Sequence, residues 1–173
     1  MNELIDFKNF KLLAKTLTDS EVIKTIRLLS VFGNNGSEVI YATTDDKVFG
    51  FGQNRFGCLG LGTYDCTPKP VLNRTLSDKA LIDIVTGCEH CIGLTANGQC
   101  YAWGLNGFGR LGIGTYDKQP TPQLIQELAD KCVVQIACGS NHTIVLTIDG
   151  QVFLIFRQVL RNFFLKIIKQ FKN

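Results

Sequence analysis

The residues best suited to bind a metal or to act in catalysis are two histidines and a pair of closely spaced cysteines. Cys88-Glu89-His90-Cys91 places two thiols and an imidazole side by side, and His142 follows His90 by 52 positions. A structural zinc site needs four such ligands. The second copy has Cys138 and Thr143 around its histidine instead of a Cys-x-x-Cys pair, so no matching half-site exists. We therefore expect no metal site, and we expect both histidines to serve packing or hydrogen bonding.

Glycine-rich runs around Gly57, Gly60 and Gly62 resemble loops that bind nucleotide phosphates. Such a loop needs a strand before it and a helix after it. Here an extended stretch, Thr67-Pro68-Lys69-Pro70, follows instead, so we expect no bound cofactor. The sequence also lacks a Ser/His/Asp set on a nucleophile elbow and a His-Glu-x-x-His motif. It therefore predicts a protein that is not an enzyme.

An internal repeat explains where these residues stand. Residues 51–65 return 52 positions later as residues 103–117, and the match continues to Asp78-Lys79 and Asp130-Lys131. A fixed period of roughly 50 residues is typical of propeller or solenoid arrays. We expect the residues that define the repeat to be structural, and they are Gly52, Asn54, Gly57, Leu59, Gly60, Gly62, Gly87, His90, Gly98, Trp103, Gly104, Asn106, Gly109, Leu111, Gly112, Gly114, Gly139, His142 and Gly150.

Each repeat unit contains a predicted β-hairpin, which makes the fold class all-β. Short apolar runs flank turns at Asp45-Asp46, Asn97-Gly98 and Asp149-Gly150. Asn-Gly and Asp-Gly supply the positive φ angles of tight hairpin turns. Paired prolines at positions 68 and 70, and again at 120 and 122, favour a strand start or a sheet edge.

Two helices are predicted outside the repeats. Thr18-Asp19-Ser20-Glu21 has the form of a capping box, and the apolar residues that follow predict a helix over residues 19–30. Near the other end, Val159, Phe163, Ile167 and Phe171 lie at helical spacing and predict an amphipathic helix.

Charge is unevenly distributed along the chain. The net charge is +3, and residues 157–173 carry five basic residues and no acid, so the rest of the chain carries −2. The repeats thus have no basic footprint, and we expect no nucleic-acid partner. The basic tail has three alternative interpretations: a membrane-surface or calmodulin-binding helix, a cover for the edge of the third unit, or an extension with no selected role.

The lack of a recognisable signal peptide and the use of cysteine indicate a protein inside the cell, either cytoplasmic or nuclear. The first ten residues mix charges into their apolar residues, which a signal peptide would not do. No run reaches the roughly 18 apolar residues of a membrane span. The seven cysteines follow no secreted framework and are expected to be reduced thiols.

The second unit closely resembles the repeat of the regulator of chromosome condensation family. The features run in the family's order: Gly87, His90, Leu94-Thr95, Gly98, Tyr101, Trp103-Gly104, Asn106, Gly109, Leu111-Gly112 and Gly114. The resemblance covers about residues 31–153. It implies a β-propeller of four-stranded blades, seven in a complete ring, that holds protein partners. Guanine-nucleotide exchange on a small GTPase is the alternative activity that the resemblance implies.

The start of the chain narrows the resemblance. Residues 20–27 and 38–43 look like the beginning of proteins that join these repeats to a BTB domain. Such proteins are adaptors linked to substrate recognition by ubiquitin ligases. The blade-connecting loops, residues 53–57 and 105–109, are expected to face the partner, whose identity the sequence does not reveal.

The repeat pattern departs from the family in the third unit. After Phe153, where a small residue, tryptophan and glycine should follow, the sequence has Leu154-Ile155-Phe156. We therefore divide the chain into an N-terminal helical segment (1–30), repeats (31–153) and a basic tail (154–173). We expect a truncated or alternatively spliced product, or a gene model that reads into non-coding sequence. The predicted architecture is a partial propeller of two full blades and part of a third. Because blades bury their faces only against neighbours, open terminal faces predict self-association.

Overall fold

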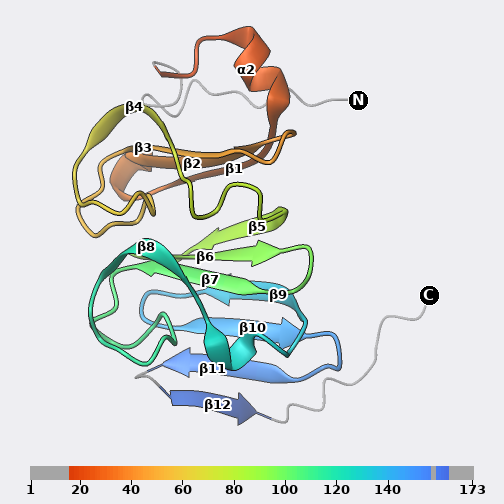
Figure 1. Ribbon diagram of the computed structural model, residues 1–173. Coiled ribbons are helices and arrows are strands. Elements are labelled where there is room, and N and C mark those ends of the chain that lie inside the picture. Colours follow the sequence, from red (N-terminus) through yellow and green to blue (C-terminus); the bar gives the residue numbers. More distant parts are fainter. Residues whose placement is uncertain (1–15, 157–158, 164–173) are drawn as a thin grey trace.

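The computed structural model describes residues 16–156 and 159–163. It contains three four-stranded antiparallel sheets, each made of strands that follow one another in the chain (Figure 1). We call these sheets blades 1, 2 and 3. Blade 1 comprises β1 (Ile26–Phe32), β2 (Glu38–Thr43), β3 (Val48–Gly52) and β4 (Thr67–Leu72); blade 2 comprises β5 (Leu81–Thr86), β6 (His90–Thr95), β7 (Cys100–Gly104) and β8 (Gln119–Leu124); blade 3 comprises β9 (Val133–Cys138), β10 (Thr143–Thr147), β11 (Val152–Phe156) and β12 (Val159–Phe163).

The third blade corrects the prediction of two full blades and part of a third. Strand β12 pairs antiparallel with β11, from Val152 opposite Phe163 to Phe156 opposite Val159. The helix expected for the tail is therefore wrong at residues 159–163, which form the fourth strand of blade 3. Hydrogen bonding of the β11 main chain to a neighbouring strand outweighs the helical spacing of the side chains. The rest of the predicted tail helix lies outside the described residues.

The N-terminal helix is shorter than predicted. Helix α2 (Ser20–Thr25) begins after Asp19, whose carboxylate accepts the main-chain N–H of Glu21 at 2.9 Å. Asp19, and not Thr18, is therefore the N-cap. The helix ends where Ile26 adopts an extended conformation, and residues 26–30 belong to β1 instead. Pairing of β1 with β2, which places Leu29 opposite Tyr41, decides between helix and strand for these residues.

The hairpin turns follow the sequence prediction. Gly98 and Gly150 have φ angles of 81° and 82°, and Asp46 takes φ 61° at the equivalent place in blade 1. The paired prolines lie in β4 and β8, which are edge strands of their sheets. Two short 3-10 helices, η2 (Asn34–Gly36) and η3 (Gln126–Leu128), lie in connections between strands.

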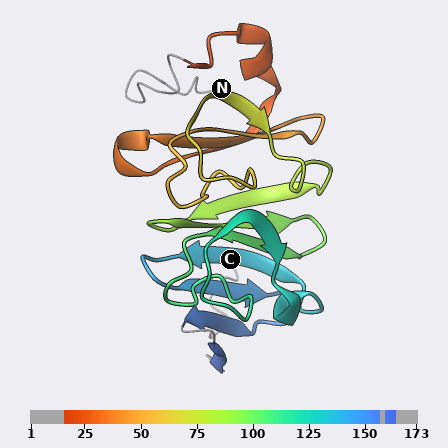
Figure 2. The ribbon, with the colours of Figure 1, turned by 60° about the vertical axis from the view of Figure 1, so that its left-hand side comes forward.

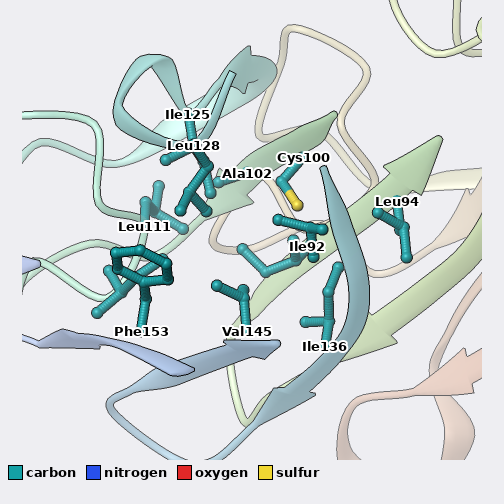
Figure 3. Close-up of a cluster of buried hydrophobic side chains, with 12 residues drawn as sticks. Ile92, Leu94, Cys100, Ala102, Leu111, Ile125, Leu128, Ile136, Val145 and Phe153 are labelled. Atoms are coloured by element: carbon teal, nitrogen blue, oxygen red, sulfur yellow. The ribbon is translucent and has the colours of Figure 1, made fainter. Parts of the chain in front are cut away.

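The blades stack face to face, and each junction has its own apolar core (Figures 1 and 2). Between blades 1 and 2 the core includes Ile40, Leu59, Leu81 and Trp103, all fully buried. A second core lies between blades 2 and 3, and Figure 3 shows the side chains of both sheets and of the loop with η3 converging on it. Its buried members are Ile92, Leu94, Cys100, Ala102, Leu111, Ile125, Leu128, Val133, Ile136, Val145, Phe153 and Ile155.

The two outer faces of the stack differ. On blade 1, Val39, Tyr41 and Phe51 are covered by Leu17 and by partly buried side chains of α2, which lies on the side away from blade 2 (Figure 1). On blade 3, Ile144 is 36% exposed. Its counterpart in blade 2, 52 residues earlier, is the fully buried Ile92. Blade 3 thus repeats, on its outer side, the apolar face with which blade 2 contacts blade 3. Among the described residues, this outer face is less covered than its counterpart on blade 2.

No helix among the described residues is long and apolar enough to cross a membrane.

Candidate functional site

One end of the stack is built almost entirely from loops. Because Glu38 pairs with Gly52, and His90 with Gly104, the connections before β2 and after β3, and before β6 and after β7, come together at the same end. Main-chain hydrogen bonds join them: Gln53 N–H donates to the Ser37 carbonyl at 2.9 Å, and its equivalent 52 residues later does the same in blade 2 at 2.7 Å. We call this end, made of residues 33–37, 53–66, 87–89, 105–118 and 139–142, the loop end.

Two asparagines hold the long loops of blades 1 and 2 in one conformation. The Asn54 amide donates to the Thr63 carbonyl at 2.8 Å, and its oxygen accepts the Leu59 N–H at 3.0 Å. In blade 2, Asn106 bonds the equivalent carbonyl and N–H at 2.5 and 3.1 Å. Both side chains are buried, so each loop is fixed by a repeated internal bridge.

We expect Asn54→Ala and Asn106→Ala to lower the free energy of unfolding by similar amounts, about 1–3 kcal/mol each, because each leaves a buried N–H and a carbonyl without a partner. Urea denaturation of the full chain followed by circular dichroism measures both losses. Gln53→Ala, at an exposed neighbouring position, is the control and should stay within about 0.5 kcal/mol. Losses no larger than the control's would show that the bridges do not stabilise the loops.

The loop of blade 1 also reaches across to blade 2. Gly62 N–H donates to the Pro120 carbonyl in β8 at 2.8 Å. A Cβ atom on Gly57 would lie 2.7 Å from the Pro120 Cα, so the two backbones meet where only glycine fits. In the other direction, the Trp103 indole of blade 2 donates to the Cys58 carbonyl at 2.6 Å. The loop thus acts as a clamp between blades.

The histidines mark the junction behind these loops. The Thr143 hydroxyl of blade 3 donates to the Arg110 carbonyl at 3.1 Å, so its oxygen accepts from Nε2 of His90 at 3.0 Å. Burial, together with the nearby Arg110 and His142, lowers the pKa of His90 to about 4. The ring is therefore neutral at physiological pH and serves as a hydrogen-bond donor between blades.

The glycines of the repeat fall into two groups. Gly87 and Gly139 lie against the rings of His90 and His142, where a Cβ atom would come within 2.3 Å of the imidazole Cε1. The others have positive φ angles at strand ends, hairpins and loop turns, and they are Gly52, Gly57, Gly60, Gly62, Gly98, Gly104, Gly109, Gly112, Gly114 and Gly150. Leu59 and Leu111 are fully buried at the two junctions.

The Cys-x-x-Cys pair does not form a metal-binding group. Cys91 is fully buried and its thiol contacts the Cys58 carbonyl at 3.4 Å. Cys88 is exposed and its sulfur lies 3.2 Å from the Ser140 hydroxyl. Within residues 16–156 and 159–163, no three His, Cys, Asp or Glu side chains are arranged to hold a metal ion.

The exposed surface of the loop end carries several aromatic side chains. Phe108, Tyr64 and Tyr116 are 49%, 46% and 51% exposed. The Lys118 ammonium lies about 5.8 Å from the ring centres of both Phe56 and Tyr64. Aromatic side chains on a fixed backbone contribute most to protein–protein interfaces, because little conformational entropy is lost when they are buried. The arrangement is therefore suited to docking a protein.

Three residues at or behind this end were not singled out by the sequence. Asn73 bonds the Gly60 carbonyl at 2.9 Å and accepts from the Leu76 N–H at 3.0 Å, but Ile125 takes its place in the next unit. Arg110 is 2% exposed and bonds the Ser140 carbonyl at 2.7 Å, where blade 1 has Cys58. Glu38 stands where the later units have histidine. Each of the three differs from the residue at the equivalent position of another unit. A search for repeated residues therefore misses them, and only a comparison of the positions that differ between units could have found them.

Comparison with protein families gives a match over most of the repeats. The sequence model of the regulator of chromosome condensation (RCC1) repeat matches residues 45–94 and 97–146, and a second model of the same repeat matches residues 81–110.

Curated relatives include two human proteins. The E3 ubiquitin-protein ligase HERC2 is 36% identical over 140 residues, which is 80% of this chain and 3% of HERC2. The probable E3 ubiquitin-protein ligase HERC4 is 38% identical over 109 residues, 62% of this chain and 10% of HERC4. The chain thus spans a small part of the length of these relatives.

Solved structures share the fold at low identity. Human WBSCR16 superposes with a TM-score of 0.69 at 22% identity, covering 79% of this chain and 37% of WBSCR16. Prp20p of Saccharomyces cerevisiae superposes with a TM-score of 0.60 at 24% identity, covering 80% of this chain and 32% of Prp20p.

Proposed function

Because this chain belongs to the RCC1 repeat family, we propose that it acts as a protein-docking module whose contact surface is the loop end of blades 1 and 2. The observation that carries the proposal is the set of exposed aromatic rings on loops that buried asparagines hold in place. Phe108 is the central residue, since its ring is 49% exposed and the Arg110 guanidinium lies 5.5 Å from the ring centre. The repeats, residues 31–153, form the docking unit in this proposal.

The finer proposal concerns what docking achieves. HERC2 and HERC4 are named as E3 ubiquitin-protein ligases, and this chain covers 3% and 10% of them. A segment of that size is consistent with the part of a ligase that recruits a client protein for ubiquitin transfer. We accordingly propose client recruitment inside the cell, and we propose no chemical step for this chain. Its combination with a BTB domain stays a prediction from the N-terminal sequence.

Regulation of a small GTPase, by nucleotide exchange, is the second candidate. Its support is the fold shared with Prp20p, whose structure is described together with its binding properties to Gsp1p and histones. Membrane or calmodulin binding through the tail stays a prediction from the sequence. Residues 159–163 form a strand where that role expects a helix, and residues 164–173 lie outside the described residues.

We expect Phe108→Ala to weaken binding of a captured and purified client at least tenfold, the loss typical of a central aromatic contact. Titration calorimetry with the full chain measures it. Ile148→Ala is the matched control, since Ile148 is 75% exposed in a hairpin at the opposite end of the stack and should leave the affinity within twofold.

Two results would speak against docking at the loop end: an unchanged affinity for Phe108→Ala, or an equal loss for Ile148→Ala. A nucleotide-release assay on a panel of small GTPases distinguishes regulation of a GTPase from client recruitment. Acceleration of release by the full chain would favour exchange over client recruitment.

A further inference from the structure

A small cavity opens at the loop end where blades 1 and 2 meet. Its volume is about 210 Å³, and its walls include Ser37, Glu38, Gln53, Arg55 and Glu89. A water molecule occupies about 30 Å³ of the liquid, so the cavity has space for several waters or for the end of one long side chain.

Glu38 is an unusual residue to find in the wall of this cavity. It occupies the repeat position of His90 and His142, and its carboxylate packs against Gly33 as those rings pack against Gly87 and Gly139. The residue is only 9% exposed. Whereas His90 bonds Thr143 of the next blade, none of the described residues donates a hydrogen bond to the Glu38 carboxylate.

The electrostatic surroundings of Glu38 favour a cation that comes from outside the chain. Burial, and secondarily the nearby Glu89, raise the pKa of Glu38 to about 7. Burying a carboxylate without a partner is unfavourable, and an ion pair with hydrogen bonds offsets the loss. Arg55 also lines the cavity, but its guanidinium lies over the Phe56 ring, 5.5 Å from the centre, and forms no ion pair in the described part of the chain.

Calcium and anions suit the cavity less well than a basic side chain. Calcium takes six to eight oxygen ligands, and two carboxylates do not supply them. An anion would face both glutamates. A lysine or arginine side chain supplies one positive charge and several N–H donors, which matches two neighbouring carboxylates.

We propose that this cavity binds a lysine or arginine side chain of a protein partner, with Glu38 as its counter-ion and Glu89 as a second acceptor. The proposal rests on the proposed docking function, since the cavity lies beside Phe56 at the loop end. It adds the chemistry of recognition: a client should present a basic residue next to the apolar side chains that meet the exposed aromatic rings.

The probes are three capped peptides, acetyl-Gly-Arg-Gly-amide, acetyl-Gly-Lys-Gly-amide and acetyl-Gly-Gln-Gly-amide, added to the full chain at pH 8. NMR of the isotope-labelled protein should show saturable shifts for the first two peptides at the amides of Ser37, Glu38 and Glu89. The glutamine peptide should produce none. Glu38→Gln, which keeps the shape of the side chain, should weaken binding at least tenfold, while Glu127→Gln, at an exposed site distant in sequence, should not change it.

Binding should also depend on pH. Only the ionised Glu38 attracts the cation, so affinity should fall about tenfold from pH 8 to pH 6, as the carboxylate with a pKa of about 7 is protonated. The other ionisable groups around it are Glu89, Arg55, Cys58, Cys88 and the buried Cys91. The Glu38→Gln protein should lose this dependence.

Three outcomes would overturn the proposal: no saturable shift with either basic peptide, equal binding of the glutamine peptide, or full binding by Glu38→Gln. Failure here is distinct from failure of docking as a whole. Peptide binding does not depend on Phe108, and the Phe108→Ala experiment does not depend on Glu38.

Discussion

Replacing Trp103 with alanine is expected to lower the free energy of unfolding by about 3–5 kcal/mol. The side chain is fully buried in the core between blades 1 and 2, and its indole N–H donates to the Cys58 carbonyl at 2.6 Å. The substitution removes the largest buried side chain of the described residues and leaves a cavity at the junction itself. Urea denaturation followed by circular dichroism measures the loss, because the chain has one tryptophan and the variant lacks tryptophan fluorescence.

Two control variants separate the contributions to this effect. Trp103→Phe keeps an aromatic ring but loses the N–H, and we expect a smaller loss of about 1–2 kcal/mol. Val134→Ala removes an apolar side chain that is 48% exposed, and it should stay within about 0.5 kcal/mol. If Trp103→Ala were no worse than Val134→Ala, the junction would not be the structure that holds blades 1 and 2 together.

The second large effect is expected at Gly104, which ends β7. Its φ is 103°, and a Cβ atom there would lie 2.7 Å from the Glu89 carbonyl oxygen and 2.9 Å from the His90 Cα. Alanine would therefore meet both an unfavourable backbone conformation and a clash with main-chain atoms that cannot turn aside. We expect Gly104→Ala to lower the free energy of unfolding by about 3 kcal/mol.

Two other glycines provide matched controls for Gly104→Ala. Gly114 has φ 80° but open space around a Cβ atom, so Gly114→Ala tests the backbone conformation alone and should cost about 1–2 kcal/mol. Gly107 has neither feature, and Gly107→Ala should stay within about 0.5 kcal/mol. Fluorescence of Trp103 during urea denaturation measures all three. Equal losses for Gly104→Ala and Gly114→Ala would contradict the close approach to Glu89.

The repeat made the blades predictable, because near-identical residues 52 positions apart occupy near-identical surroundings. Asn54 and Asn106 form the same bridges, and the hairpin turns fall at the predicted Asn-Gly and Asp-Gly pairs. A side chain that recurs in register carries information about its neighbours as well as about its own strand. For this reason the sequence predicted an all-β stack of blades correctly.

Prediction failed where the repeat ends. Ile26 and Val159 lie in segments whose apolar residues have helical spacing, yet both belong to strands that complete a sheet. Their conformation is determined by the free edges of β2 and β11, which local spacing does not encode. Glu38 was missed for a related reason, since a single departure from the repeated histidine becomes meaningful only when the cavity and Glu89 are seen beside it.

Strand β12 shows which part of a blade tolerates change. It carries none of the repeat residues, yet its main chain completes the third sheet as fully as β4 and β8 complete theirs. An extended backbone can pair with a sheet edge through its main-chain groups whatever most of its side chains are. The junctions between blades, in contrast, depend on particular side chains. In a lineage of such genes, mutations should accumulate fastest in the outermost strand, and peptide tags or reporter sequences are best grafted there.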